Sequence, residues 1–233
     1  MPNALTRSAK PLTILQANVG KGATAHEIAL ALAYDSLIDI IFIQKPYIFS
    51  DSSRRITKAH PSYEAFAPLD NWETSPRAIT YVRKGAGLKA TQIRPCTSRD
   101  LVFLQIQAGN SPVLLVANVY NAPIGCNDPG SAVDHLLTLP TTLWRLAFIA
   151  GDFNLHHTDW DPDCKRQTVH AELFVQWLNR NSFTLTSEIG QPTHRAGNTL
   201  DLAFAAGALA TTTARAEDLD VTSDHSSLLS TIS

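Results

Sequence analysis

Six short apolar runs between residues 12 and 154 constrain the fold of this chain more than any other feature of its sequence. Each run is rich in β-branched or aromatic residues and is bounded by turn formers, which is the pattern of a β-strand. Several are apolar at every position, as strands buried on both faces are. The expected strands are 12–18, 39–44, 78–83, 101–107, 113–120 and 146–154.

Two helices are expected between these strands. Thr24 and Glu27 fit the S/T-x-x-E capping box that marks the start of a helix. A second helix is predicted over 167–180, where four apolar residues recur at helical spacing: Leu173, Phe174, Trp177 and Leu178. The polar, proline-containing segment 50–76 is interpreted as a surface excursion beside a substrate cleft. The pattern predicts an α/β fold with two packed sheets covered by helices.

Length and composition favour one domain. The chain has 233 residues, 44% of them hydrophobic, and nothing forces a division into two. Residues 1–11 are expected to be an N-terminal extension and 12–233 the domain. The chain lacks a signal-peptide pattern and any run near the ~20 apolar residues of a membrane span. The three cysteines suit neither a zinc site nor a disulfide framework. We therefore expect a monomeric intracellular protein without a membrane partner.

The net charge of −2 argues against a protein that coats nucleic acid through a broad basic surface. It is compatible with an enzyme that touches DNA briefly. Basic residues gather at Arg54, Arg55 and Lys58, and again at Lys165 and Arg166. Either group could meet phosphates, and a solvated loop is the alternative for each.

Polar side chains follow several expected strands, where α/β folds tend to build their sites. Asn18 closes the first strand and Lys45 directly follows the second, although each alone is compatible with an ordinary turn or strand end. The fifth and sixth strands end in a larger polar set: Asn118, Tyr120, Asp152, Asn154, His156 and His157. Because buried polar groups cost free energy unless they are partnered, this set favours a functional site. We expect at most one of the two adjacent histidines to face the cleft.

Three segments near the end of the sequence add further candidates. Thr193 lies in PTH, Asp201 in NTLDLAF, and Asp224 with His225 in SDHSSLL. An Asp-His dipeptide at the start of an apolar strand can place a carboxylate and an imidazole beside a reacting group.

In chain order, the segments NV, QKP, NVY, GDFN, TLD and SDH span nearly the whole sequence. Together they resemble the exonuclease-endonuclease-phosphatase superfamily, and within it the endonuclease domains of LINE-type, non-LTR retroelements. The resemblance implies a deoxyribonuclease-like four-layer sandwich, with two mostly antiparallel sheets flanked by helices. It implies a magnesium-dependent endonuclease that nicks target DNA for retrotransposition, with Mn²⁺ as the alternative ion. DNA and the reverse transcriptase of the same element would be its partners, and the nucleus its place of action.

The resemblance also implies metal and substrate roles. Asn18 would help to hold the metal-ligand network, and Asp224 would serve at the metal. Tyr120 would reach the scissile phosphate, Asn154 would donate to the phosphoryl oxygens, and Thr193 would contact the phosphate region or support the site. Since a phosphodiester anion repels nucleophiles, a cation and aimed donors are needed to neutralise the developing charge.

The resemblance also implies roles for three residues that would handle protons or charge. Asp152 would orient or deprotonate the attacking water. Asp201 would accept a hydrogen bond from His225, which would face the phosphate. A carboxylate that holds a catalytic imidazole also fixes its tautomer.

Lys45 departs from the family pattern, which has a metal-binding glutamate directly after the glutamine that ends the second strand. Magnesium is often held by only one or two carboxylates. We therefore expect Lys45 to weaken metal binding, with its ammonium either in water or paired with Asp224. Two other functions stay open: a catalytically impaired domain that still binds DNA or a partner, and a phosphoesterase of the same fold with another substrate.

Overall fold

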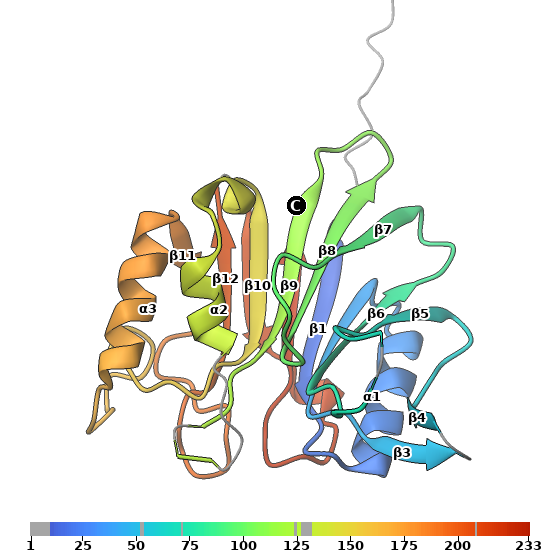
Figure 1. Ribbon diagram of the computed structural model, residues 1–233, viewed down its shortest axis with the longest axis horizontal. Helices are drawn as coiled ribbons and strands as arrows, with labels where there is room; N and C mark the ends of the chain where they lie inside the picture. The colour runs from blue at the N-terminus through green and yellow to red at the C-terminus, as the bar shows by residue number, and fades with distance from the viewer. Residues whose placement is uncertain (1–9, 52–53, 71, 124, 127–131, 208) are drawn as a thin grey trace, which may run out of the picture.

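The computed structural model describes residues 10–51, 54–70, 72–123, 125–126, 132–207 and 209–233. Two six-stranded sheets pack against each other (Figure 1). The first sheet has the order β13 (Thr211–Arg215), β14 (Leu228–Ile232), β1 (Leu12–Asn18), β2 (Ile40–Gln44), β6 (Ala78–Arg83), β5 (Tyr63–Phe66). The second has the order β11 (Phe183–Leu185), β12 (Asp201–Ala206), β10 (Ala147–Asp152), β9 (Leu114–Tyr120), β8 (Leu101–Ala108), β7 (Leu88–Ile93).

Each sheet contains one parallel pair, β1 with β2 and β9 with β10, and its other neighbours are antiparallel. A two-stranded ribbon accompanies the sheets, formed by β3 (Ile48–Asp51) and β4 (Arg54–Thr57). The helices are α1 (Ala23–Asp35), α2 (Ala132–Thr138) and α3 (Val169–Arg180), with 3₁₀ turns at Thr141–Trp144 and Glu217–Leu219. The predicted sandwich of two mostly antiparallel sheets flanked by helices is confirmed.

Three groups of buried apolar side chains fill the three interfaces between the four layers. The middle group lies between the sheets, where the rings of Phe42 and Phe148 are 6.4 Å apart. Ile41, the neighbour of Phe42, faces the other way and packs under α1. The third group lies under α2 and α3, on the outer face of the second sheet (Figure 1). This alternation explains why the central strands are apolar at every position.

Both predicted helices exist, with different starts. α1 begins at Ala23 after the N-cap Gly22, and no side chain caps it. Thr24 is therefore already inside the helix, and Glu27 forms an ion pair with Lys58 instead of completing the predicted capping box. α3 begins two residues later than predicted, because the Thr168 hydroxyl accepts a hydrogen bond from the Ala171 N–H at 3.1 Å. Within its predicted apolar stripe, Leu173 stays 45% exposed while the other three residues are buried.

Two expectations about the strands need correction. The sixth run leaves the sheet at Asp152, before residue 154, because Asn154 turns the chain at φ 47°. The segment 50–76 is more than a surface excursion, since β5 pairs with β6 and extends the first sheet. The predicted extension 1–11 lies almost entirely outside the described residues. No helix in the described part of the chain is long and apolar enough to cross a membrane.

A buried histidine ties α1 to the segment after β2. The Nδ1 atom of His26 accepts the Tyr47 N–H at 3.2 Å, and its Nε2 lies 3.0 Å from the Tyr81 hydroxyl. That hydroxyl donates to the Lys58 carbonyl at 2.6 Å, so the imidazole must donate to it from Nε2. Burial and the charge of Lys58 lower the pKa of His26 to about 4, although Glu27 acts in the opposite direction.

We expect the protein to lose stability between pH 6.5 and about 4 through His26. The unfolded chain takes up a proton there as the pH falls, whereas the folded protein resists it until its lower pKa is reached. A depression from 6.5 to about 4 corresponds to a loss of about 3 kcal/mol. Urea unfolding near the two ends of this range measures the loss. In His26→Gln the difference between the two pH values should shrink by that amount, and an undiminished difference would contradict the assignment.

Candidate active site

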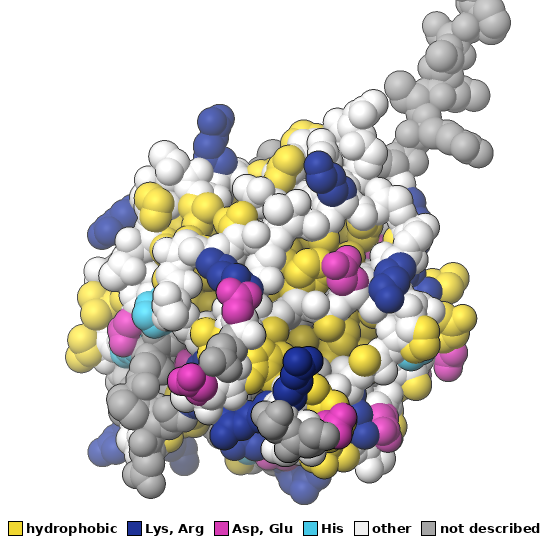
Figure 2. Space-filling view, turned by 45° about the vertical axis from the view of Figure 1, so that its right-hand side comes forward, with side chains coloured by type: hydrophobic (Ala, Val, Ile, Leu, Met, Phe, Trp, Pro, Cys, Tyr) yellow, Lys and Arg dark blue, Asp and Glu magenta, His cyan; other side chains and the backbone are white. Residues whose placement is uncertain are grey.

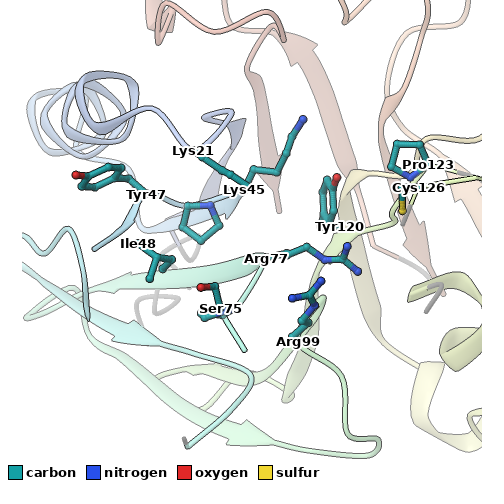
Figure 3. Close-up of a pocket in the computed structure, with 12 residues that line it drawn as sticks. Lys21, Lys45, Tyr47, Ile48, Ser75, Arg77, Arg99, Tyr120, Pro123 and Cys126 are labelled. Atoms are coloured by element: carbon teal, nitrogen blue, oxygen red, sulfur yellow. The ribbon is translucent and has the colours of Figure 1, made fainter. Parts of the chain in front are cut away.

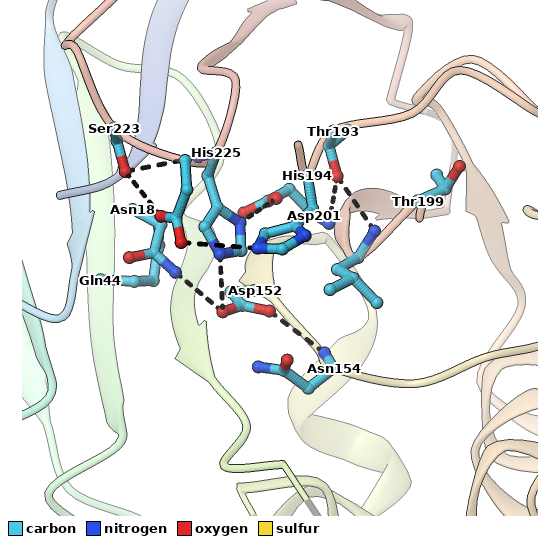
Figure 4. A network of polar contacts seen from close by, with 12 residues as sticks. Asn18, Gln44, Asp152, Asn154, Thr193, His194, Thr199, Asp201, Ser223 and His225 are labelled. Carbon is cyan, nitrogen blue, oxygen red and sulfur yellow. Dashed lines mark hydrogen bonds and ion pairs between the residues drawn. The ribbon is translucent and has the colours of Figure 1, made fainter. Parts of the chain in front are cut away.

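Strand register brings the predicted residues to one edge of the sandwich (Figure 4). Asn18 ends β1 beside the end of β2, and Tyr120 ends β9 beside Asp152 at the end of β10. Asp201 opens the antiparallel β12 directly opposite Asp152. His225 joins them from the segment before β14, which pairs with the segment around Thr193. Residues that are far apart in the sequence therefore meet where the two parallel pairs end.

Asp152 lies at the centre of this group and is fully buried. One carboxylate oxygen accepts from the Asn18 amide at 2.8 Å, and the other accepts from the backbone N–H of Asn154 at 3.2 Å. The side-chain oxygen Oδ1 of Asn18 in turn accepts from the Gly20 N–H at 3.1 Å. The Asn154 amide donates to the Asn121 carbonyl at 2.8 Å. The Asp152 carboxylate is thus held in one orientation from both sides.

His225 and Asp201 form the predicted hydrogen bond, with 2.7 Å between Nδ1 and Oδ2. The free ring nitrogen, Nε2, points toward Asp152 and lies 4.0 Å from its Oδ2. The Thr193 hydroxyl is buried and accepts the backbone N–H groups of Leu200 and Asp201 at 3.0 and 2.9 Å. Two roles were expected for Thr193, contact with the phosphate region or support of the site. These hydrogen bonds correspond to the second, because they hold the start of the Asp201 strand.

Charges in this group act on one another. Burial raises the pKa of Asp152 and the Asp201 charge raises it further, against the opposing charges of His225 and Lys45. Burial alone would lower the pKa of His225, but the hydrogen bond and charge of Asp201, with the charge of Asp152, raise it overall. The imidazole is thereby biased toward its protonated form beside a carboxyl group whose ionisation is disfavoured.

Sequence reasoning missed a buried polar chain that supports the site. The Gln16 amide donates to Asp201 at 2.9 Å and to Gln44 at 2.7 Å, and Gln44 donates to Asn118 at 2.6 Å. The Asn118 amide closes the chain on the Ile79 carbonyl at 2.9 Å. These contacts run from one sheet to the other and fix the second oxygen of Asp201. The signal in the sequence is a polar residue inside or at the end of an otherwise apolar strand.

Tyr120 lies next to two cations. The Lys45 ammonium and the Arg77 guanidinium are 5.8 and 5.2 Å from the centre of its ring. Burial and the Asp152 charge raise the pKa of Tyr120 to about 12, so the phenol remains a hydrogen-bond donor at neutral pH. The backbone of Lys45 is left-handed, with φ 45°, and its N–H donates a hydrogen bond to the Arg77 carbonyl.

The expected pairing of Lys45 with Asp224 does not form, since the salt bridges among the described residues include none between them. The Asp224 carboxylate lies 3.5 Å from Nε2 of His194 instead. Burial acts to raise the pKa of Asp224, but the charges of His225 and Lys45 lower it overall. Lys45 therefore influences both carboxylates that border the cleft, although it contacts neither.

The donor set at the edge offers places for a cation. Ligand atoms of His194, Asp224 and His225 lie within 4.8 Å of one another, as do those of Asp152, Asp201 and His225. Oxygen donors suit magnesium, and the Asp224 carboxylate and the side-chain oxygen of Asn18 both border the Gly20 turn. The residues present thus supply oxygen ligands on one side, while Lys45 supplies a positive charge where a further carboxylate was expected.

At most one of the two adjacent histidines was expected to face the cleft. His157 is buried away from the catalytic group, with its Nε2 3.3 Å from Glu172 on α3 and its ring against Trp160. His156 is only half-buried.

Comparisons with known proteins agree with this geometry. Residues 114–229, which include Tyr120, Asp152, Asp201 and His225, match a family model described as endonuclease-reverse transcriptase. By this match the chain is similar to the endonuclease/exonuclease/phosphatase superfamily. No curated protein sequence matches it significantly.

Solved structures show the same fold. The endonuclease domain of TRAS1, a telomere-specific non-LTR retrotransposon, superposes with a TM-score of 0.74 at 19% identity, over 95% of this chain and 98% of that one. An AP endonuclease from Leishmania major gives 0.66 at 14% identity, over 96% and 88%. The D. rerio protein TDP2, complexed with a single-strand DNA product, gives 0.54 at 14% identity, over 96% and 99%.

Proposed function

We propose that this protein is a divalent-metal-dependent endonuclease that hydrolyses DNA phosphodiester bonds, with magnesium as the ion and Mn²⁺ as an alternative. The observation that carries the proposal is the meeting of Asp152 with the Asp201–His225 pair at one strand-end cleft. The likeness to a retrotransposon endonuclease supports target-site nicking as its role. Such nicking would take place on nuclear DNA, beside the reverse transcriptase of the same element.

In the proposed reaction each residue acts through the contacts described. Asp152, oriented by Asn18, positions the attacking water and takes up its proton. The imidazolium of His225, aimed by Asp201, faces the charge that develops on the phosphoryl oxygens. The Tyr120 phenol donates a hydrogen bond to the same phosphate. Asn154 fixes Asp152 through its backbone and donates to the substrate once its amide leaves the Asn121 carbonyl.

Asp224 and Asn18 would hold the magnesium ion. When bound, the ion would supply the positive charge that a phosphodiester needs at the transition state. Lys45 opposes its binding, because an ammonium repels a divalent cation.

A plasmid assay tests the proposal. The parent protein should convert supercoiled plasmid to the nicked circle in magnesium but not in a chelator, and Asp152→Asn should lose this activity. The exposed Asp163 offers a matched control, so Asp163→Asn should nick like the parent. Activity that persists undiminished in Asp152→Asn would overturn the assignment of the site.

Lys45 favours a second candidate function, a catalytically impaired domain that still binds DNA. Its ammonium occupies the cleft beside Tyr120, and its charge acts on Asp152 and Asp224. A gel shift on the same plasmid DNA separates the two, since the impaired domain would retain the shift without nicking.

A further inference from the structure

A row of four cations runs along the strand ends beside Tyr120. The backbone N–H of Lys21 donates to the Lys45 carbonyl at 2.7 Å, that of Lys45 to the Arg77 carbonyl at 2.9 Å, and that of Arg77 to the Arg99 carbonyl at 2.8 Å. Three consecutive backbone hydrogen bonds therefore place four basic residues side by side. We call Lys21, Lys45, Arg77 and Arg99 the cation row.

The cation row lines a cavity of about 420 Å³ that opens next to the catalytic group (Figure 3). No acidic residue is among the described residues that line this cavity. Arg77 is paired with Asp100 at 2.5 Å, from outside the cavity lining. Burial and the charge of Arg77 lower the pKa of Arg99, which indicates that the two guanidinium groups are close, as Figure 3 also shows. The positive charge of the cavity is thus concentrated on one side of Tyr120.

The local excess contrasts with the rest of the protein. The whole chain has a net charge of −2, and on the face seen in Figure 2 basic side chains are interspersed with acidic ones. Within the first basic group that the sequence suggested as a phosphate contact, two residues are used within the fold: Arg55 donates to the Trp72 carbonyl at 3.1 Å, and Lys58 pairs with Glu27. Lys165 and Arg166, the second suggested group, are exposed. The cation row therefore offers an anion a cavity in which positive charge gathers without an acidic residue among its described lining.

We propose that the cation row binds consecutive phosphates of one DNA strand, next to the phosphate held at Tyr120, and that it does so without a divalent ion. Backbone segments joined by such hydrogen bonds lie about 4.8 Å apart, as paired strands do, so three steps along the row cover about 14 Å. The row is therefore long enough to contact more than one phosphate of a strand. Lys45 belongs both to the row and to the catalytic cleft, and it holds the strand in register with Tyr120. This inference rests on DNA being the substrate.

The test measures binding of a fluorescein-labelled duplex oligonucleotide to the full chain in EDTA, where metal-dependent nicking cannot contribute. Lys21→Gln and Arg99→Gln should each weaken binding several-fold, equally for unrelated sequences. Each should reduce the slope of log Kd against log salt by about 0.9, and the double variant by about twice that. Arg99→Lys keeps the charge and should keep the slope. Lys89→Gln removes an exposed cation on β7, outside the row, and should bind like the parent.

Two outcomes would overturn the inference. The first is that folded Lys21→Gln and Arg99→Gln proteins, with melting temperatures near that of the parent, bind DNA as Lys89→Gln does. The second is an effect confined to duplex DNA, because a row that contacts one strand must show the same losses on a single-stranded oligonucleotide. A parent protein that binds through the row but fails to nick would leave the inference standing and reject only the proposed activity.

Discussion

Lys45→Glu should nick supercoiled plasmid in magnesium at least about tenfold faster than the parent protein. At ~4 Å and an effective dielectric of about 20, a pair of unit charges interacts by on the order of 4 kcal/mol, and a divalent ion roughly doubles that. The exchange removes a repulsive ammonium and adds a carboxylate of the kind that magnesium prefers. Even if screening removes most of this energy, about 1.4 kcal/mol is enough for a tenfold change.

The structure sharpens this expectation. Lys45 has φ 45° and is tied to the strands on both sides, so a glutamate here should keep the same backbone and enter the same cleft. Its charge already influences Asp152 and Asp224, which shows that the position is electrostatically coupled to both. Lys45→Gln serves as the control, because it removes the repulsion without adding a ligand and should fall between the two proteins.

The same exchange should act in the opposite direction on metal-free binding. In EDTA, Lys45→Glu should bind the labelled duplex more weakly than the parent, because it replaces a cation of the row by an anion. Faster nicking in magnesium together with weaker binding in EDTA would separate the effect of Lys45 on the metal from its effect on the phosphates. Equal, robust nicking by the parent and Lys45→Glu in magnesium would refute the claim that Lys45 limits metal binding.

The sandwich was predictable because its central strands are apolar on both faces, which requires a layer on each side. The strands that sequence reasoning missed lack that pattern. β13 reads TTTAR and buries only Thr213, and β11 has only three residues. Such edge strands are identified by their partners in the sheet more than by their own composition.

Sequence motifs predicted part of the catalytic group. Asp152, Asp201 and His225 could be named because each ends or precedes an apolar run. Asn118 was named as well, but the hydrogen-bonded chain that links it through Gln44 to Gln16 could not be predicted, since its bonds join residues 28 and 74 positions apart. The geometry of Lys45 depends on a left-handed backbone and on which strand ends become neighbours, and neither follows from local sequence.

The backbone of Gly151 lies so close to that of Val119 that no side chain fits between them. It lies in β10, immediately before Asp152, at φ 156°. A Cβ atom there would lie 1.8 Å from the Val119 carbonyl oxygen and 2.7 Å from the Val119 carbonyl carbon. Both clashing atoms belong to the backbone of the parallel partner β9, so no side-chain rotation can relieve them.

Gly151→Ala is therefore expected to destabilise the protein by about 3 kcal/mol or more, from overpacking and backbone strain together. For a domain of this size that corresponds to a fall in melting temperature of roughly 6–12 °C. Gly87→Ala is the matched control, since Gly87 also has a positive φ, 73°, but nothing lies within 4 Å of the added Cβ. Its loss should be limited to the strain of about 1–2 kcal/mol.

The two variants should differ in activity as well as in stability. If β10 moves away from β9 to admit the methyl group, Asp152 leaves the 2.8 Å contact with Asn18 and its place opposite Asp201. Nicking by Gly151→Ala should then be lost even below its melting temperature, while Gly87→Ala nicks like the parent. Thermal unfolding followed by circular dichroism, with plasmid nicking at a temperature where both variants are folded, measures the two effects. A Gly151→Ala protein that melts within the range of the control and nicks normally would show that the strand pair can open without disturbing Asp152.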